Sequence, residues 1–301
     1  FLKNFNYSNS MRSEKIYQSK REPRYSNISI RDVDYQITEW GDNKKELILY
    51  LHGWGDTGST FQFVVDSFEK DWHVVAPDWR GFGKSSHFGM SYWFPDYLAD
   101  LDVLLDKFSP EEPIHIIGHS MGANVAGLYA GIKPNRIKSF INLEGFGLTD
   151  GDPEKAPDNY LRWIEKGKCG EKFQVYESFN ELVPRILKRS PNMTIDKALY
   201  VAHEWAELNN DGVIRLRADP LHKLPNANQY RRSEAEACWK RITAKILVVV
   251  GEETKFSAVL TPFIDSDIDQ FASNNSKLIS IPNTGHMLHF EAPDVLAKEI
   301  E

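Results

Sequence analysis

The sequence predicts an α/β protein built on a doubly wound, mostly parallel sheet. Short apolar runs rich in β-branched residues recur along the chain, at 46–53, 72–78, 113–120, 138–145, 245–252 and 277–285. Near-continuous apolar runs of this length are typical of strands buried on both faces. Stretches with helical periodicity separate the first four runs, at about 59–70, 93–108 and 121–133. This alternation implies βαβ units and therefore a parallel sheet.

Two further segments complete the expected organisation. Residues 25–40 alternate between polar and apolar side chains, as in an antiparallel hairpin. The alternation of strands and helices stops at 146 and resumes at 245, and the intervening segment is helical in pattern and rich in aromatic residues. We therefore expect four regions, which are an N-terminal tail (1–24), a first core part (25–148), an inserted helical cap (149–240) and a second core part (241–301).

The composition excludes several classes of protein. A net charge of −7 argues against nucleic acid as the main partner, because binding to phosphates needs an excess of lysine and arginine. Two cysteines, Cys169 and Cys238, make neither a disulfide framework nor a zinc site, which favours a cytoplasmic protein. No apolar stretch reaches the length of about 18 residues that suggests a membrane span. The sequence leaves the oligomeric state open.

A glycine turn follows the first apolar run of the core. Gly53, Gly55 and Gly58 have the spacing G-x-G-x-x-G between a predicted strand and a predicted helix, and Asp78 ends the next strand. This local pattern matches a dinucleotide-binding turn, so an oxidoreductase is one hypothesis. The same glycines also suit any sharp reversal that directs backbone N–H groups toward an anion.

The segment GHSMG (118–122) matches the G-x-S-x-G pattern of a nucleophile elbow. A predicted strand precedes it and a helix rich in small residues follows it, as the elbow requires. Gly118 and Gly122 allow the tight turn, which exposes the hydroxyl of Ser120 at the N-terminus of the helix. Ser120 is therefore the expected nucleophile.

A serine nucleophile needs a base, and His286 is the expected one. It follows the last apolar run, so it should lie at the carboxyl end of the sheet together with Ser120. The pair His286 and His289 lacks the i,i+4 spacing of a zinc-binding helix, so no metal is expected from this motif.

With these motifs the chain resembles the α/β-hydrolase superfamily, and in particular esterase-like serine hydrolases with a helical cap. The resemblance covers about 25–145 and 240–301, and it depends on four segments, HGWGDTG (52–58), APDWRGFGKS (76–85), GHSMG (118–122) and NTGHMLHFEAP (283–293). It implies that the N–H groups of Trp54 and Met121 form an oxyanion hole. It also implies that His52 holds its loop by hydrogen bonds and that Asp78 is a structural residue of a turn.

The acidic partner of His286 departs from the common family pattern. Many members place an aspartate three residues after the glycine that ends the seventh strand, where this chain has Thr254. Other members carry the acid at the end of the sixth strand, which is the position of Glu144. We therefore expect Glu144 to orient His286, and the alternatives are Glu252, Glu253, Asp265 and Asp267.

These residues predict a cofactor-independent serine hydrolase that acts through an acyl-enzyme on a small carboxylic ester or related acyl substrate. Aromatic side chains indicate an apolar substrate group, with Phe146, Trp163 and Trp205 as candidate pocket residues. Thioesterase, lactonase and carbon–carbon bond hydrolase activities remain alternatives. A dehalogenase is disfavoured because its nucleophile is an aspartate. The rival hypotheses are a binding protein that has lost turnover and the dinucleotide-dependent oxidoreductase.

Overall fold

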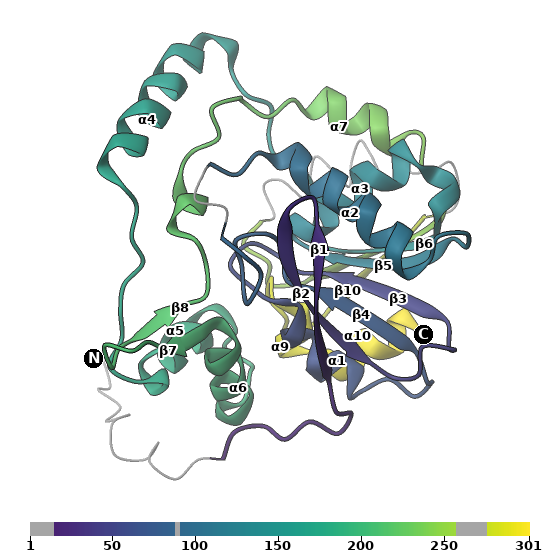
Figure 1. Ribbon diagram of the computed structural model, residues 1–301. Coiled ribbons are helices and arrows are strands. Elements are labelled where there is room, and N and C mark those ends of the chain that lie inside the picture. The colour runs from purple at the N-terminus through teal and green to yellow at the C-terminus, as the bar shows by residue number, and fades with distance from the viewer. Residues whose placement is uncertain (1–14, 88–90, 257–275) are drawn as a thin grey trace.

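The computed structural model describes residues 15–87, 91–256 and 276–301. Eight strands form one sheet in the order β1–β2–β4–β3–β5–β6–β9–β10 (Figure 1). Their bounds are β1 Arg24–Ile30, β2 Val33–Trp40, β3 Leu47–Leu51, β4 His73–Pro77, β5 Ile114–His119, β6 Ile137–Leu143, β9 Lys245–Gly251 and β10 Ser276–Ile281. β1 and β2 pair antiparallel, β2 pairs antiparallel with β4, and the remaining pairs are parallel. The predicted fold class is confirmed.

The burial of the strands explains their composition. Every residue of β4 is buried, and four of the five residues of β3 are buried. Helices cover both faces of the sheet, so side chains on both sides of these strands leave water. β10 lies at the edge, and most of its residues are partly or fully exposed.

Helices pack on the two faces of the sheet (Figure 1). One face carries α2 (Phe94–Phe108), α3 (Met121–Ile132) and α7 (Arg232–Trp239), and the other carries α1 (Gln62–Val65), α9 (Leu288–Glu291) and α10 (Pro293–Ile300). The helices predicted at 93–108 and 121–133 are present. The one predicted at 59–70 is shorter, because it consists of the 3₁₀ turn η2 (Gly58–Phe61) followed by α1.

The first helix ends where the N-terminal segment meets it. The carboxylate of Asp66, directly after α1, accepts hydrogen bonds from the backbone N–H groups of Lys20 and Arg21 at 3.1 and 2.7 Å. The hydroxyl of Tyr17 donates to the same carboxylate at 2.9 Å. The side chain of Asp66 therefore ties the N-terminal segment to this end of the helix.

Most of the regular elements between β6 and β9 are helices. The elements of this segment are η4 (Pro153–Lys155), α4 (Ala156–Cys169), η5 (Phe179–Glu181), α5 (Val183–Arg189), α6 (Ile195–Trp205), β7 (Ala206–Leu208), β8 (Ile214–Leu216), η6 (Pro220–Lys223) and α7. β7 and β8 form a separate two-stranded sheet. Within the described ranges, no helix has both the length and the apolar composition needed to cross a membrane.

Parts of this segment pack differently against the core. α5 and α6 share an apolar cluster with Phe63 of α1 and Phe290 of α9. α7 instead packs on α3, so closely that a Cβ atom on Gly131 would lie 1.8 Å from the carbonyl oxygen of Cys238. α4 stands apart from the sheet in Figure 1. A cap with the bounds 149–240 stays a prediction.

Candidate active site

Ser120 occupies a strained turn between β5 and α3. Its backbone has φ 51° and ψ −114°, a conformation that L-residues rarely adopt and that costs about 1–3 kcal/mol. A Cβ atom on Gly118 would lie 2.5 Å from Cα of Ala123, and one on Gly122 would lie 2.2 Å from the carbonyl oxygen of Leu51. Only glycine fits at these two positions. The turn is therefore shaped as a nucleophile elbow requires.

Glu144 lies next to this elbow, at the end of β6. The N–H of Ser120 donates to the carbonyl oxygen of Leu143 at 2.8 Å, which joins the two strand ends. Glu144 itself has φ 56°, so both residues have a positive φ that residues other than glycine rarely adopt. Strained residues cluster at functional sites, and here Ser120 donates this hydrogen bond while Glu144 follows its acceptor.

The carboxylate of Glu144 is buried and fully engaged by donors. The side chain has no solvent exposure. One oxygen accepts from the backbone N–H of Gly251 at 2.8 Å, and the other accepts from the hydroxyl of Thr254 at 2.7 Å and from Nδ1 of His286 at 2.6 Å. A buried carboxylate is tolerated only with such partners. These three donors hold it in one orientation.

His286 lies on the same side of the molecule as Ser120. Nε2 of His119, the residue before Ser120, donates to the backbone carbonyl of His286 at 2.9 Å. The rings of His119 and His286 are 4.7 Å apart between centroids. Because Nδ1 of His286 donates to Glu144, its Nε2 keeps a lone pair and can accept a proton.

Two backbone segments lie next to Ser120, namely the first turn of α3 and the loop after β3. Met121 is the first residue of α3, where N–H groups have no partner within the helix. On the other side, the loop after β3 packs against the elbow. A Cβ atom on Gly53 would lie 2.8 Å from Nδ1 of His119 and 3.2 Å from Cβ of Ser120. Trp54 follows Gly53, and 45% of its surface is exposed to solvent.

Comparison with known proteins identifies the family of this chain. Residues 46–293 match the family model described as alpha/beta hydrolase fold. The chain belongs to the α/β-hydrolase family. It is 26% identical to a serine hydrolase-like protein of Danio rerio, over 87% of this chain and 82% of that protein. It is 30% identical to a serine hydrolase-like protein of Dictyostelium discoideum, over 89% of this chain and 77% of that protein.

A solved structure supports the same fold. A thioesterase domain from the curacin biosynthetic pathway matches this α/β hydrolase with a TM-score of 0.79 and 22% identity, over 93% of this chain and 99% of that chain. At this level of identity the likeness concerns the fold alone. The family resemblance predicted from the sequence is confirmed.

His52 forms the hydrogen bonds expected for a residue that holds its loop. Its Nδ1 donates to the carbonyl oxygen of Gly53 at 2.7 Å, and its Nε2 accepts from the backbone N–H of Trp79 at 2.8 Å. Burial lowers the pKa of His52 to about 4, which keeps the ring neutral. Both ring nitrogens of His52 are therefore engaged.

The carboxylate of Asp78 connects the two loops that the sequence analysis singled out. It accepts hydrogen bonds from the backbone N–H groups of Gly58 at 2.8 Å and Lys84 at 2.9 Å. Burial raises the pKa of Asp78 to about 7. In a dinucleotide site the corresponding acid would bind ribose, whereas here it binds the backbone of the glycine turn. This geometry disfavours the oxidoreductase hypothesis and supports a structural role.

The other candidate acids lie in different surroundings. Glu252 and Glu253 are exposed, and the carboxylate of Glu252 accepts from the backbone N–H of Asn283 at 3.4 Å. Asp265 and Asp267 lie outside the described residues. The hydrogen bond from His286 therefore falls on Glu144 and on neither of the two exposed glutamates.

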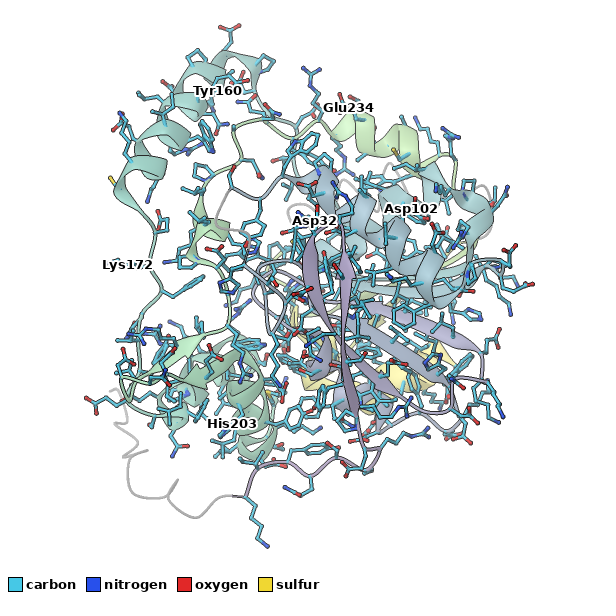
Figure 2. All side chains as sticks on the ribbon, viewed as in Figure 1. Asp32, Asp102, Tyr160, Lys172, His203 and Glu234 are labelled. Atoms are coloured by element: carbon cyan, nitrogen blue, oxygen red, sulfur yellow. The ribbon has the colours of Figure 1, made fainter. Side chains whose placement is uncertain are left out.

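The three candidate pocket residues lie in different parts of this α/β hydrolase. Phe146 is buried in the apolar core under α3 and α7. Trp205 ends α6, and its Nε1 donates to the carboxylate of Asp56 at 2.7 Å. Trp163 is 36% exposed on α4, the helix that carries Tyr160 in Figure 2. Their part in a substrate pocket stays a prediction.

Two residues near the site were not predicted from the sequence. From the sequence, Thr254 is only the residue that stands in place of the common aspartate, but its hydroxyl donates to the neighbouring acid Glu144. Asn142 makes a pair of hydrogen bonds with the backbone of Gly145, at 2.8 and 2.7 Å, that close the turn carrying Glu144. An asparagine two residues before a turn glutamate was the available signal for this pair.

Proposed function

We propose that this α/β hydrolase is a serine hydrolase that cleaves a small carboxylic ester or related acyl substrate with an apolar group, through an acyl-enzyme. The observation that carries the proposal is the hydrogen bond of 2.6 Å between Nδ1 of His286 and Glu144, beside the strained turn of Ser120. It fixes the tautomer in which Nε2 can act as a base.

The first half of the reaction forms the acyl-enzyme. Nε2 of His286 takes the proton of the Ser120 hydroxyl while Oγ attacks the carbonyl carbon of the substrate. The backbone N–H groups of Trp54 and Met121 donate to the resulting oxyanion, and the loss of one such donor costs about 2.7–4 kcal/mol. The carbon–oxygen bond then breaks, and the imidazolium of His286 returns the proton to the departing alcohol.

The second half regenerates the enzyme. His286 takes a proton from water, which attacks the acyl carbon, and the imidazolium then protonates Oγ of Ser120 as the carboxylic acid leaves. Glu144 stabilises the imidazolium in both halves. Its three hydrogen-bond donors hold the carboxylate in place, so the charge is available without reorganisation. The proposed chemistry uses side chains and backbone alone.

Assays with several substrate classes decide which kind of bond the enzyme cleaves. Esters, thioesters and lactones share the tetrahedral intermediate that this arrangement would stabilise, and carbon–carbon bond hydrolysis is a further alternative. The similar structure from the curacin pathway is described as a thioesterase domain, so thioesters belong in the substrate panel. An apolar acyl group agrees with the aromatic residues that follow Phe146 in the segment between β6 and β9.

The decisive experiment is labelling with a fluorophosphonate, followed by peptide mapping. We expect one adduct per chain, on Ser120, and none in Ser120→Ala. A series of p-nitrophenyl esters of increasing acyl length, with matched thioesters, then measures kcat and KM. Multiple turnover that is lost in Ser120→Ala supports the proposal.

Two results would overturn the proposal in favour of another function. An adduct without multiple turnover of any ester, thioester or lactone would favour a binding protein that has kept the fold. The absence of an adduct together with quenching of tryptophan fluorescence by NADH would favour the oxidoreductase.

A further inference from the structure

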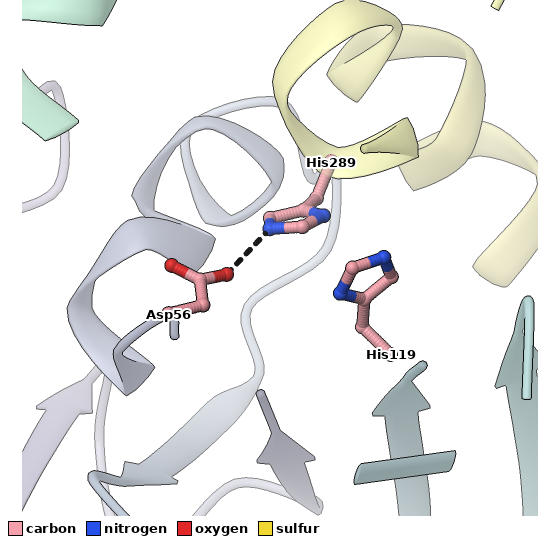
Figure 3. A group of neighbouring side chains, drawn as sticks. All are labelled: Asp56, His119 and His289. Carbon is pink, nitrogen blue, oxygen red and sulfur yellow. Dashed lines mark hydrogen bonds and ion pairs between the residues drawn. The ribbon is translucent and has the colours of Figure 1, made fainter. Parts of the chain in front are cut away.

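A buried aspartate connects the loop after β3 to three other elements. Asp56 is 3% exposed and ends the segment 53–56, here called the oxyanion loop because it carries the expected oxyanion donor. One carboxylate oxygen of Asp56 accepts hydrogen bonds from the hydroxyl of Thr60 in η2 at 2.8 Å and from Nε1 of Trp205 in α6 at 2.7 Å. The other oxygen accepts from Nε2 of His289 in α9 at 3.0 Å (Figure 3). The carboxylate therefore ties the oxyanion loop to all three elements.

The carboxylate of Asp56 is a charged acceptor. Burial alone would raise its pKa, but the hydrogen bonds from His289 and Trp205, together with electrostatic interactions, lower it below the ordinary value of an aspartate. Hydrogen bonds to an ionised acceptor are stronger than those between neutral groups. The loss of a donor to Asp56 should therefore loosen the oxyanion loop.

A second contact joins the end of α6 to the same part of the core. Glu204 precedes Trp205, and its carboxylate accepts from the hydroxyl of Ser59 in η2 at 2.6 Å. The ring of Trp205 also lies beside that of Phe290 in α9, at 6.0 Å between centroids. Trp205 follows Asp56 by 149 positions in the sequence. The end of α6 is therefore bound both to the oxyanion loop and to η2.

The oxyanion loop lies so close to the nucleophile that small movements of it matter. A Cβ atom on Gly53 would lie 3.2 Å from Cβ of Ser120. The backbone N–H of Asp56 donates to the carbonyl oxygen of Gly53 at 3.3 Å, which closes the loop into a turn. A shift of Asp56 therefore moves Trp54, which lies inside this turn. A displacement of about 1 Å at a catalytic group can cost about 100-fold in rate.

We propose that Trp205 and Asp56 are positioning residues of this hydrolase, and that the hydrogen bond between them lets α6 hold the N–H of Trp54 in place for the oxyanion. Trp205 then governs the rate of the chemical step, whereas a residue of the substrate pocket would govern the fit of the acyl group. The effect on the rate rests on the proposed function. The hold of α6 on the oxyanion loop does not.

Trp205→Phe tests the effect on the rate, because phenylalanine keeps an aromatic ring but lacks the Nε1–H group. We expect kcat to fall by at least about tenfold for every p-nitrophenyl ester of the series, with KM nearly unchanged. A change in KM and in the preferred acyl length would instead assign Trp205 to the substrate pocket and overturn the proposal.

Trp72→Phe is the matched control. Nε1 of Trp72 also donates to a carboxylate, that of Glu301 at 3.0 Å, and Trp72 directly precedes β4. This position is at the amino end of the parallel strands, whereas Ser120 follows the carboxyl end of β5. The control variant loses the same type of hydrogen bond and should keep the kcat of the wild type.

A double-mutant cycle tests whether Trp205 acts through Asp56. Asp56→Asn keeps the shape of the side chain and removes its charge, so it should lower kcat at least as much as Trp205→Phe does. If the two residues act through one hydrogen bond, the double variant should lose little more than Asp56→Asn alone. Losses that multiply would overturn the proposal. Circular dichroism checks folding, and if Asp56→Asn does not fold, hydrogen exchange in Trp205→Phe decides.

Hydrogen–deuterium exchange measures the hold on the oxyanion loop without any substrate. Peptides that cover residues 50–60 should exchange faster in Trp205→Phe than in the wild type, and at the wild-type rate in Trp72→Phe. Unchanged exchange in Trp205→Phe would overturn the proposal.

The exchange measurement also separates this proposal from the proposed function. If the wild type turns over no acyl substrate, the proposed function fails, and faster exchange in Trp205→Phe still supports the hold of α6 on the loop. If the wild type is active and Trp205→Phe keeps its kcat, the effect on the rate is refuted and the proposed function stands.

Discussion

Thr254 donates its hydroxyl to the carboxylate of Glu144 across 2.7 Å, although the two residues are 110 positions apart in the sequence. Thr254 stands where many α/β hydrolases have their acid, and here it contacts an acid that comes from the neighbouring strand end. The same carboxylate oxygen accepts from His286. A change at Thr254 should therefore act through Glu144 on His286.

We expect Thr254→Val to lower kcat by roughly tenfold or more and to leave KM nearly unchanged. Valine keeps the shape of the side chain but removes a hydrogen bond to a charged group, which contributes about 1.5–3 kcal/mol. Thr254→Ser retains the hydroxyl and should restore most of the activity. Steady-state kinetics on the best p-nitrophenyl ester measures both variants. A purely structural role would instead lower the urea midpoint and leave kcat per folded enzyme unchanged.

Glu144→Gln should lower kcat by orders of magnitude while the protein stays folded. The amide cannot stabilise an imidazolium by charge, and it presents either an oxygen or an NH₂ group to Nδ1 of His286. Glu253→Gln is the matched control, since Glu253 is exposed, and it should have little effect. The opposite ranking of the two variants would assign the acid to the loop after β9.

Local constraints made the elbow predictable from the sequence. The spacing of Gly118, Ser120 and Gly122 is enforced by contacts within a few residues, and the close approaches at both glycines bear this out. The acidic partner of His286, in contrast, depends on which strand ends become neighbours in the sheet. Pairing of Leu143 with Val249 and of Gly251 with Ile281 brings the ends of β6, β9 and β10 together. That arrangement is a property of the whole sheet, so the sequence could offer only a choice of acids.

The same limit applies to the buried side chains of Asp56, His119 and His289. Nε2 of His289 donates to the carboxylate of Asp56, which lies 233 positions away in the sequence. His119 ends β5 and lies near both residues (Figure 3). Chain spacing cannot show a group that a loop, a strand end and a helix bring together.

Gly53→Ala should reduce kcat by about 10²–10³-fold and slow labelling by the fluorophosphonate. The added methyl group would lie 2.8 Å from Nδ1 of His119 and 3.2 Å from Cβ of Ser120, so the loop carrying Trp54 must move away from the elbow. Loss of one oxyanion donor has an effect of this size. Gly167→Ala on α4, where a Cβ atom meets nothing within 4 Å, is the control. Unchanged kcat in Gly53→Ala would show that catalysis does not depend on the close approach of this loop to the elbow.

The last prediction concerns pH and the stability of the folded chain. His222 of η6 stacks between the rings of Phe82 and Tyr92, at centroid distances of 3.8 and 3.6 Å. Burial lowers the pKa of His222 from its ordinary 6.5 to about 4. Below pH 6.5 the unfolded chain therefore binds a proton that the folded chain excludes. The stability contributed by this group is complete above pH 6.5 and is lost as the pH falls toward 4.

His222→Phe should remove this loss while keeping the aromatic stack. At pH 7.5 the variant should be less stable by about 1 kcal/mol, because the hydrogen bond of 3.2 Å from Nε2 to the carbonyl oxygen of Arg80 is gone. This difference in stability should shrink as the pH falls from 6.5 to 4, because only the wild type loses stability by keeping this ring unprotonated in the folded state. Urea midpoints of both proteins across this range measure the difference. A difference that stays constant with pH would show that His222 does not titrate as its burial requires.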